Sequence, residues 1–171
     1  MYSVNDTILY GSQLCRIEEN TKMDFGGSPT EYYVLKPVYN DTSTIYVPVH
    51  NEKCMGKMRR ILSAAEIYAL IRSMPDEHSD WIENDTARRE KYKEVLASGD
   101  RKALVRMIKA LYGHQEVRQA QGRKLHVSDE RFLKEAERTL YDEFALVLNI
   151  KQDQVLPFIL DQIEVAEKER A

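Results

Sequence analysis

The sequence has few of the features that mark secreted, membrane-spanning or metal-binding proteins. Only two cysteines, Cys15 and Cys54, occur in 171 residues, and neither belongs to a CxxC or His/Cys cluster. This usage is typical of unpaired thiols in a reducing cytosol. No run of roughly 18 apolar residues occurs, and the N-terminal stretch MYSVNDTILYG lacks the pattern of a signal peptide. We therefore expect a cytoplasmic protein with no membrane partner.

Signatures of catalysis and of cofactor binding are missing as well. The four histidines are scattered along the chain, and neither HExxH nor GxxxxGK followed by Ser or Thr occurs. No nucleophilic side chain is paired with a base in a known motif. We expect no enzymatic activity, no metal ion and no cofactor.

The first third of the chain is rich in β-branched and aromatic residues. Four short segments of this kind, separated by turn residues, cover residues 7–10, 14–17, 31–35 and 44–49. No segment with helical periodicity lies among them, so we predict a small antiparallel β-barrel of the SH3 or Tudor kind. Pro48 in the last segment indicates that this strand lies at an edge of the sheet or at a bulge.

From Ser63 onward the apolar residues recur with the period of a helix. Ser63 and Glu66 fit a capping box at the start of a first helix, which Met74-Pro75 ends. Asp100 is placed to cap a third helix. The other predicted helices run from residue 84 or 85 to 96, from Ser128 to a C-cap at Asn149, and over roughly 153–168.

Together these patterns predict a two-domain α+β protein. The first domain, residues 1–56, is the SH3/Tudor-like antiparallel barrel, and the second, residues 57–171, is an all-α bundle of about five helices. The basic stretch 57–60 marks the junction between them.

Positive charge is concentrated in one part of the sequence. Residues 86–124 contain eleven Lys or Arg and four Asp or Glu, a net charge of +7, although the whole chain carries −3. A basic zone in an acidic protein favours a polyanionic partner, with the acidic remainder limiting indiscriminate binding.

Two groups of cations in this zone are candidate contacts. Lys102, Arg106 and Lys109 project opposite the apolar stripe of their helix, where they form either a solvated face or a basic ridge. Arg88 and Arg89 lie in a first helical turn, where exposed cations oppose the helix dipole at a cost of about 0.3–1 kcal/mol each. A nearby phosphate would remove that cost; the alternative is a structural ion-pair network.

Trp81, the only tryptophan, lies in the polar stretch HSDWIENDTARR just before these arginines. One interpretation is a lid that packs on the helical bundle. The other is an exposed aromatic side chain that wedges or stacks against bases in a minor groove. Spacing alone does not decide between the two.

Several motifs in the chain resemble the CarD/CdnL family of bacterial transcription regulators. In the first half these are VNDTILYG, EYYVLKP and STIYVPV followed by Asn51. In the second half the matching features are the tryptophan followed by a basic helix, then LASGD, Leu111-Tyr112 and residues 125–135. The similarity spans nearly the whole chain, with the motifs in the same order.

This resemblance implies a function without catalysis. The Tudor-like barrel is expected to dock on a lobe of the RNA polymerase β subunit by pairing an exposed strand edge. The helical domain is expected to contact promoter DNA just upstream of the −10 element, largely independently of sequence. There the family's tryptophan wedges at the upstream fork of the melted bubble, slows its reclosure and so stabilises the open complex.

The resemblance also assigns roles to individual residues. Trp81 corresponds to the wedge. The candidate DNA contacts are Arg88, Arg89, Lys93, Lys124 and Arg131. The polymerase-facing surface corresponds to Lys22, Met23 and Tyr46.

The chain departs from the family pattern at some positions. Glu130 replaces a basic residue in the loop before the fourth helix, so Arg131 or Lys124 would take over that contact, and Trp81 lies farther from Asp100 than in other members. An alternative is a protein-protein adaptor on polymerase whose helical domain does not contact DNA. Nothing in the sequence demands a dimer, so we expect a monomer associated with the nucleoid through polymerase.

Overall fold

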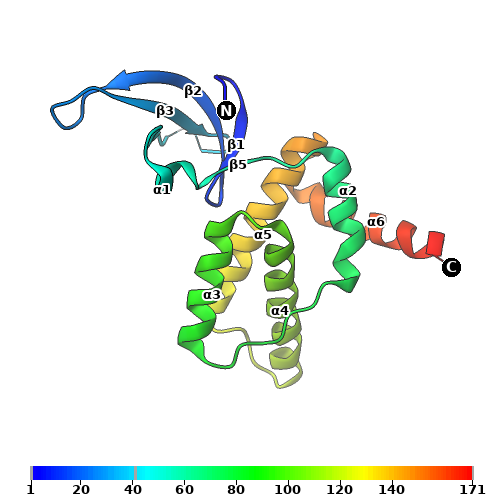
Figure 1. Ribbon diagram of the computed structural model, residues 1–171. Helices are drawn as coiled ribbons and strands as arrows, with labels where there is room; N and C mark the ends of the chain where they lie inside the picture. The colour runs from blue at the N-terminus through cyan, green and yellow to red at the C-terminus, as the bar shows by residue number, and fades with distance from the viewer. Residues whose placement is uncertain (1, 41, 171) are drawn as a thin grey trace. The chain divides into compact units, whose positions relative to one another are not determined.

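The computed structural model describes residues 2–40 and 42–170 (Figure 1). The chain divides into two compact units: the first extends to Ile61 and includes Ala97–Gly99, and the second comprises Leu62–Leu96 and the residues from Asp100 on. The first unit is built on a β-sheet and the second consists of helices. The predicted two-part α+β architecture is therefore confirmed.

The first unit is a five-stranded antiparallel sheet with the order β4-β3-β2-β1-β5. A short helix, α1 (Glu52–Met55), precedes the last strand and is capped by Asn51, whose side chain accepts a hydrogen bond from the Cys54 amide. The strands are β1 (Thr7–Tyr10), β2 (Gln13–Met23), β3 (Thr30–Pro37), β4 (Ile45–Pro48) and β5 (Met58–Arg60).

Alternation of side chains builds the core of this sheet. Cys15, Ile17, Leu35 and Val47 are fully buried in it, together with Ile8, because successive residues of a strand point to opposite faces. The register of β2 against β3 shifts between Ile17 and Glu19, and such a bulge bends a strand and increases its twist. Burial raises the pKa of the Cys15 thiol to about 11, so this cysteine is an inert core residue.

Four of the five strands were predicted, and β2 is longer than expected. The missed strand, β5, pairs antiparallel with β1, with Ile8 opposite Arg60. Only Met58 of its three residues is buried, so the local sequence reads as a basic linker. The predicted domain boundary at residue 56 lies before this strand. As predicted from Pro48, β4 is an edge strand of the sheet.

The described residues of the second unit form five α-helices and two 3-10 turns, in agreement with the predicted bundle of about five helices. In chain order these are α2 (Ala64–Ser73), η1 (Met74–Asp76), α3 (Asp85–Ser98), α4 (Arg101–Ala120), α5 (Val127–Leu148), η2 (Gln152–Gln154) and α6 (Val155–Arg170). Apolar side chains from all five helices form one core, in which Ile67, Leu111 and Phe144 are fully buried.

Most helix ends follow the predicted capping chemistry. Ser63 and Glu66 form a complete capping box, and Asp100 accepts the amide hydrogen bond of Ala103. Asn149 ends α5 in the left-handed conformation, with φ of 54°. The start of α5 was predicted one residue late, since the helix begins at Val127 and has His126 as its N-cap.

Glu143 fixes the starts of two helices at once. Its buried carboxylate accepts hydrogen bonds from the Leu62 amide, just before α2, at 2.9 Å and from the Arg101 guanidinium, in the first turn of α4, at 2.7 and 3.0 Å. A buried carboxylate requires such partners, so this contact fixes where α2 and α4 begin relative to α5.

No helix within the described ranges combines the length and the apolar composition needed to cross a membrane.

Candidate nucleic-acid interface

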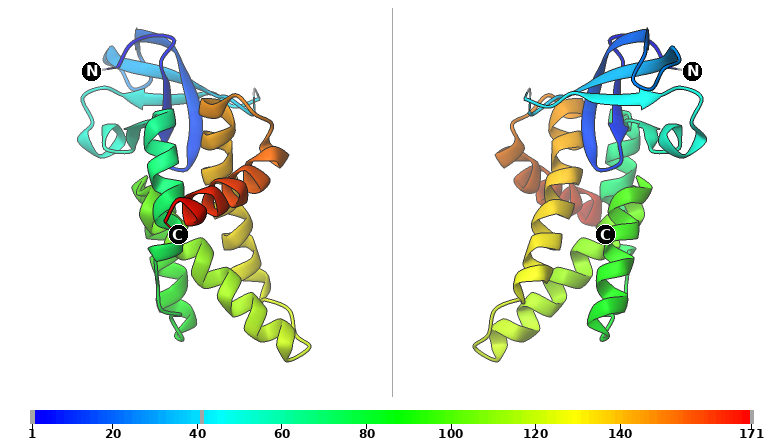
Figure 2. Two further views of the ribbon diagram at one scale, coloured as in Figure 1. Left: turned by 90° about the vertical axis from the view of Figure 1, so that its right-hand side faces the viewer. Right: turned by 90° about the vertical axis from the view of Figure 1, so that its left-hand side faces the viewer.

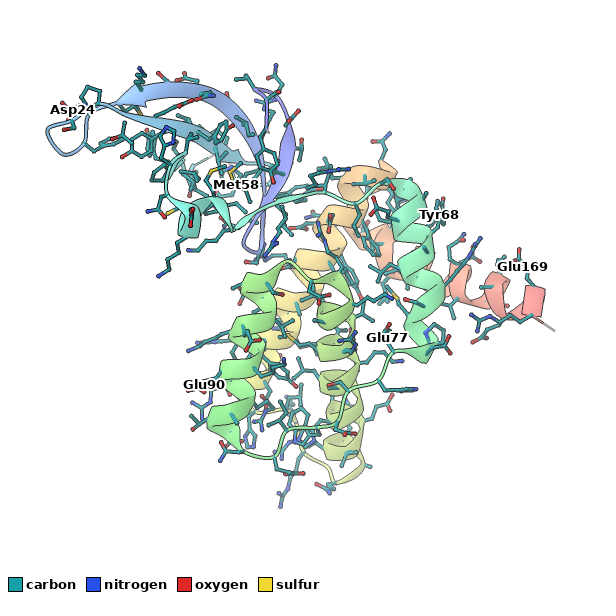
Figure 3. The ribbon with its side chains drawn as sticks, viewed as in Figure 1. Asp24, Met58, Tyr68, Glu77, Glu90 and Glu169 are labelled. Atoms are coloured by element: carbon teal, nitrogen blue, oxygen red, sulfur yellow. The ribbon has the colours of Figure 1, made fainter. Side chains whose placement is uncertain are left out.

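The segment that carries Trp81 is not helical and runs across α4. It joins η1 to α3 and crosses α4 in Figure 1, and Glu77 is labelled on it in Figure 3. Lys109 of α4 donates to the carbonyl oxygens of Met74 at 2.7 Å, Pro75 at 3.4 Å and Glu77 at 2.6 Å. A lysine is well suited to this position, because the last carbonyls of a helix lack intrahelical partners.

Arg106 binds the same segment through a side chain. Its Nε donates to Glu77 Oε2 at 2.8 Å, and Lys102 lies 4.0 Å from Oε1 of the same carboxylate. The hydrogen bond from Arg106, assisted by the charges of Arg106, Lys102 and Lys109, lowers the pKa of Glu77. The predicted basic ridge of α4 is therefore largely engaged within the protein, where it holds the segment before Trp81.

Trp81 itself is partly buried and packs against the helical core. Its indole is stacked on the imidazole of His114, with ring centroids 3.8 Å apart and planes 8° apart. The guanidinium carbon of Arg88 lies 4.5 Å from the indole centroid, within the range of a cation–π interaction. The side chain is thus neither fully exposed nor a core residue.

Arg88 is the buried centre of an ion-pair network and is only 3% exposed. It binds both carboxylate oxygens of the buried Asp129, at 2.9 and 3.1 Å, and Oδ1 of Asp85 at 2.8 Å. It also donates to the carbonyl oxygen of Ile82 at 2.9 Å. This burial is at odds with the predicted contact of Arg88 with a phosphate. The alternative interpretation, a structural ion-pair network, describes the surroundings of Arg88. The sequence carried a signal for this burial. Arg88 precedes Tyr92 by four residues and Val95 by seven, which is the spacing of residues on the buried face of a helix.

Four other predicted DNA contacts are exposed at the same end of the helical unit. Arg89 and Lys93 lie four residues apart on α3, and Lys124 and Arg131 lie in the α4–α5 connection and on α5. Within the described residues none of the four forms a salt bridge. Because Arg88 joins the first turn of α3 to Asp129 in the first turn of α5, these side chains extend from neighbouring elements. We call this end, comprising residues 81–93 and 121–131, the tip; it is the lower end of the helices in Figures 1 and 2.

Local backbone chemistry fixes the loop that carries Lys124. Gly122 has φ of +71°, and the amides of Gly122 and Arg123 donate to the carbonyls of Gln119 and Arg118. This is the hydrogen-bond pattern of a Schellman C-cap, in which glycine takes the left-handed position. Arg118 in turn donates to the Lys124 carbonyl at 2.5 Å. Arg123 is exposed beside Lys124 and adds a cation that was not among the predicted contacts.

Glu130, where the family pattern has a basic residue, is exposed and pairs with Lys134 at 3.2 Å. Its charge is thus partly balanced one helical turn away.

The predicted polymerase-facing residues lie on two strands, β2 and β4, that are separated by β3 in the sheet. Lys22 and Met23 end β2, and Tyr46 is an exposed residue of the edge strand β4. Phe25, 63% exposed, makes edge-on ring contacts with Tyr46 at 5.4 Å and Tyr32 at 5.3 Å. Asp24 marks the start of this β2–β3 turn in Figure 3. The sequence pattern did not identify Phe25; its position beside the Gly26-Gly27 turn was the available signal.

In the part of the chain that is described, no three His, Cys, Asp or Glu side chains are arranged to hold a metal ion.

Comparison with protein families gives two matches. The model of the CarD-like/TRCF RID domain matches residues 2–62, and the model of the CarD C-terminal domain matches residues 66–159. No curated protein gave a significant match to the chain.

Proposed function

The chain belongs to the CarD family of RNA polymerase-interacting transcription regulators, and from this membership we propose two finer contacts. The first unit binds the polymerase β subunit. The second unit binds promoter DNA upstream of the −10 element in the minor groove, with Trp81 as the wedge, and thereby stabilises the open complex.

The observation that carries the DNA part of the proposal is the composition of the tip. A partly exposed indole lies at the same end of the helical unit as cations that have no salt-bridge partner among the described residues, including Arg89, Lys93 and Lys124. Such cations bind phosphates and release counterions, which gives affinity without sequence specificity. An aromatic side chain inserted between base steps stabilises unstacked DNA. Phosphate contacts alone do not distinguish unstacked DNA from an intact duplex.

Arg88 has a different part in this proposal from the one its sequence position indicated. Its buried guanidinium orders the segment that carries Trp81, through Ile82 and the indole ring, and it joins α3 to α5. The direct phosphate contacts are proposed for Arg89, Lys93, Lys124 and Arg131.

The polymerase part of the proposal is supported by the edge strand β4. Its outer edge offers backbone donors and acceptors to a partner strand. The neighbouring aromatic side chains, Tyr46 and Phe25, supply rigid contact area that is common at the centre of interfaces. Lys22 and Met23 extend this surface along β2.

Open-complex lifetime tests the proposal most directly. The Trp81→Ala variant is expected to co-purify with polymerase as the wild type does but to shorten the lifetime of promoter complexes. A Tyr46→Ala, Phe25→Ala double variant is expected to lose the polymerase contact instead. A lifetime unchanged by Trp81→Ala would contradict the wedge assignment.

One observation favours the adaptor alternative, in which the helical unit binds a protein. Leu156 and Leu160 of α6 are 39% and 58% exposed beside an apolar cavity of about 370 Å³ that Ile108 and Tyr112 help to line. Reversing the charge of Arg89 and Lys93 together separates the two functions. Promoter complexes of unchanged stability would support the adaptor.

A further inference from the structure

We propose that His114 is a positioning residue for Trp81: its imidazole, fixed on α4, sets the plane of the indole that the tip presents. This inference rests on the proposed role of Trp81 at DNA. It concerns a residue that is not itself one of the proposed DNA contacts.

The contact is close and nearly parallel. The ring centroids of Trp81 and His114 are 3.8 Å apart and the planes differ by 8°. Most aromatic pairs in proteins are offset or edge-to-face at 4.5–7 Å, and the other aromatic pairs in the described residues lie between 5.3 and 6.4 Å. The stacked pair therefore constrains the orientation of the indole as well as its position.

His114 is a rigid platform because of its place on α4. It follows the fully buried Leu111 by three residues, so it lies at the margin of the helical core and is itself partly buried. Trp81, in contrast, belongs to a segment without regular secondary structure. Contacts with other elements must then fix the indole, since no helical or strand backbone does so.

Those contacts follow one another along α4. Lys109 and Arg106 of α4 bind Glu77. Trp81, four residues after Glu77 in the segment, stacks on His114 farther along α4. An extended chain covers about 3.3 Å per residue and a helix rises about 1.5 Å per residue. The step from Glu77 to Trp81 thus spans a length similar to that from Arg106 to His114. The segment therefore contacts α4 at two places, through Glu77 and through Trp81.

The charge state of the imidazole suits this role. Burial and the nearby Arg118 lower the pKa of His114, and Arg88 adds to this effect, while Asp129 and Glu83 oppose it. The lowered pKa favours the neutral form of the imidazole. A neutral ring stacks on the indole without placing a second cation next to Arg88, whose guanidinium already lies 4.5 Å from the indole centroid.

Trp81 is the only tryptophan, so fluorescence excited selectively at tryptophan reports the surroundings of this side chain. We would compare His114→Leu, which keeps an apolar side chain without a flat ring, with His114→Phe, which keeps a flat ring. His114→Leu is expected to increase acrylamide quenching of Trp81 and to lower its anisotropy, and His114→Phe is expected to restore both. Val117→Ala, at an exposed position of the same helix, is the control and should change neither.

The functional readout is the open-complex lifetime with full-length protein and polymerase. His114→Leu is expected to shorten it by about two- to ten-fold, the range that an aromatic pair contributes, with recovery in His114→Phe. Circular dichroism melts of each variant separate this effect from a loss of fold. If only His114→Leu loses its fold, the lifetime measured with the folded His114→Phe variant decides. An intact lifetime then supports the stacking role, and a lost one contradicts it.

The outcomes separate the inference from the proposed function. If Trp81→Ala shortens the lifetime but folded His114→Leu does not, the positioning role is overturned while the wedge stands. If quenching and anisotropy are unchanged in His114→Leu, the stacking role is overturned directly. If Trp81→Ala has no effect on lifetime, the wedge itself is overturned, and the fluorescence data alone decide whether His114 orients the indole.

Discussion

Lys109 Nζ lies 2.6 Å from the carbonyl oxygen of Glu77, and this contact joins the middle of α4 to the segment that leads to Trp81. The same ammonium group also binds the carbonyls of Met74 and Pro75 at the end of η1. Lys109 lies on the face of α4 opposite the apolar stripe, and its partners are backbone carbonyl groups of the protein itself. The positive charge of the +7 zone is partly internal to the fold.

Replacing Lys109 by Met is expected to destabilise the helical unit. The variant keeps the apolar stem but leaves three carbonyl oxygens without their charged donor, and hydrogen bonds to charged groups contribute about 1.5–3 kcal/mol. We expect the free energy of unfolding, measured in urea, to fall by roughly that amount. Lys102→Met is the control, since this more exposed lysine is 4.0 Å from Glu77, and equal effects of the two variants would contradict the assignment.

Removing one partner of the Arg88–Asp129 pair is expected to be more damaging. Both side chains are buried, at 3% and 0% exposed, and an unpaired buried charge costs about 3–5 kcal/mol. We expect Arg88→Met to lower the free energy of unfolding by an amount in this range, and Arg89→Met, one residue later and exposed, to change it by less than about 0.5 kcal/mol. The combined variant Arg88→Met, Asp129→Leu should recover part of the loss; no recovery would argue against the pair.

Adjacent arginines show where sequence patterns are informative and where they are not. Arg88 and Arg89 were equivalent as cations of a first helical turn, yet one is buried and the other exposed. A helix turns about 100° per residue, so only Arg88 faces α5. Its partner Asp129 lies 41 positions away, and nothing in the local sequence marks that carboxylate as buried.

Features set by neighbouring residues were predicted well. The capping box of Ser63 and Glu66, the cap at Asp100 and the left-handed Asn149 each depend on a few consecutive residues. β5 depends on pairing with a strand some fifty residues earlier and was missed. The same reason applies to the site: the stack of Trp81 on His114 joins distant segments, and neither residue carries a local signal for the other.

Acid is expected to weaken the helical unit through two carboxylates. The hydrogen bond and charge of Arg88 lower the pKa of Asp85, and those of Arg106 lower the pKa of Glu77. A carboxyl group with a lowered pKa in the folded state binds its proton more weakly there than in the unfolded chain. Its stabilising effect is therefore complete above the ordinary carboxyl pKa and is lost as the pH falls through the lowered value.

Urea titrations between about pH 7 and pH 3 measure this dependence, because the midpoint follows the proton uptake of the unfolded chain. Glu77→Gln should have a flatter pH profile than the wild type. Glu94→Gln is a suitable control, since Glu94 is an exposed residue 3.8 Å from Lys91. A profile of Glu77→Gln as steep as that of the wild type would rule out this contribution of Glu77.

The last prediction concerns the salt dependence of DNA binding by the exposed cations of the tip. If Arg89, Lys93, Lys124 and Arg131 each neutralise one phosphate, the slope of log K against log[salt] should fall by about 1 for each cation replaced by Ala. The loss should be similar for different DNA sequences, because phosphate contacts carry no sequence information. Binding of fork-containing duplexes, measured by fluorescence anisotropy over a range of salt, provides the slopes. Lys134→Ala is the matched control, since this lysine is paired with Glu130 and its loss should leave the slope nearly unchanged.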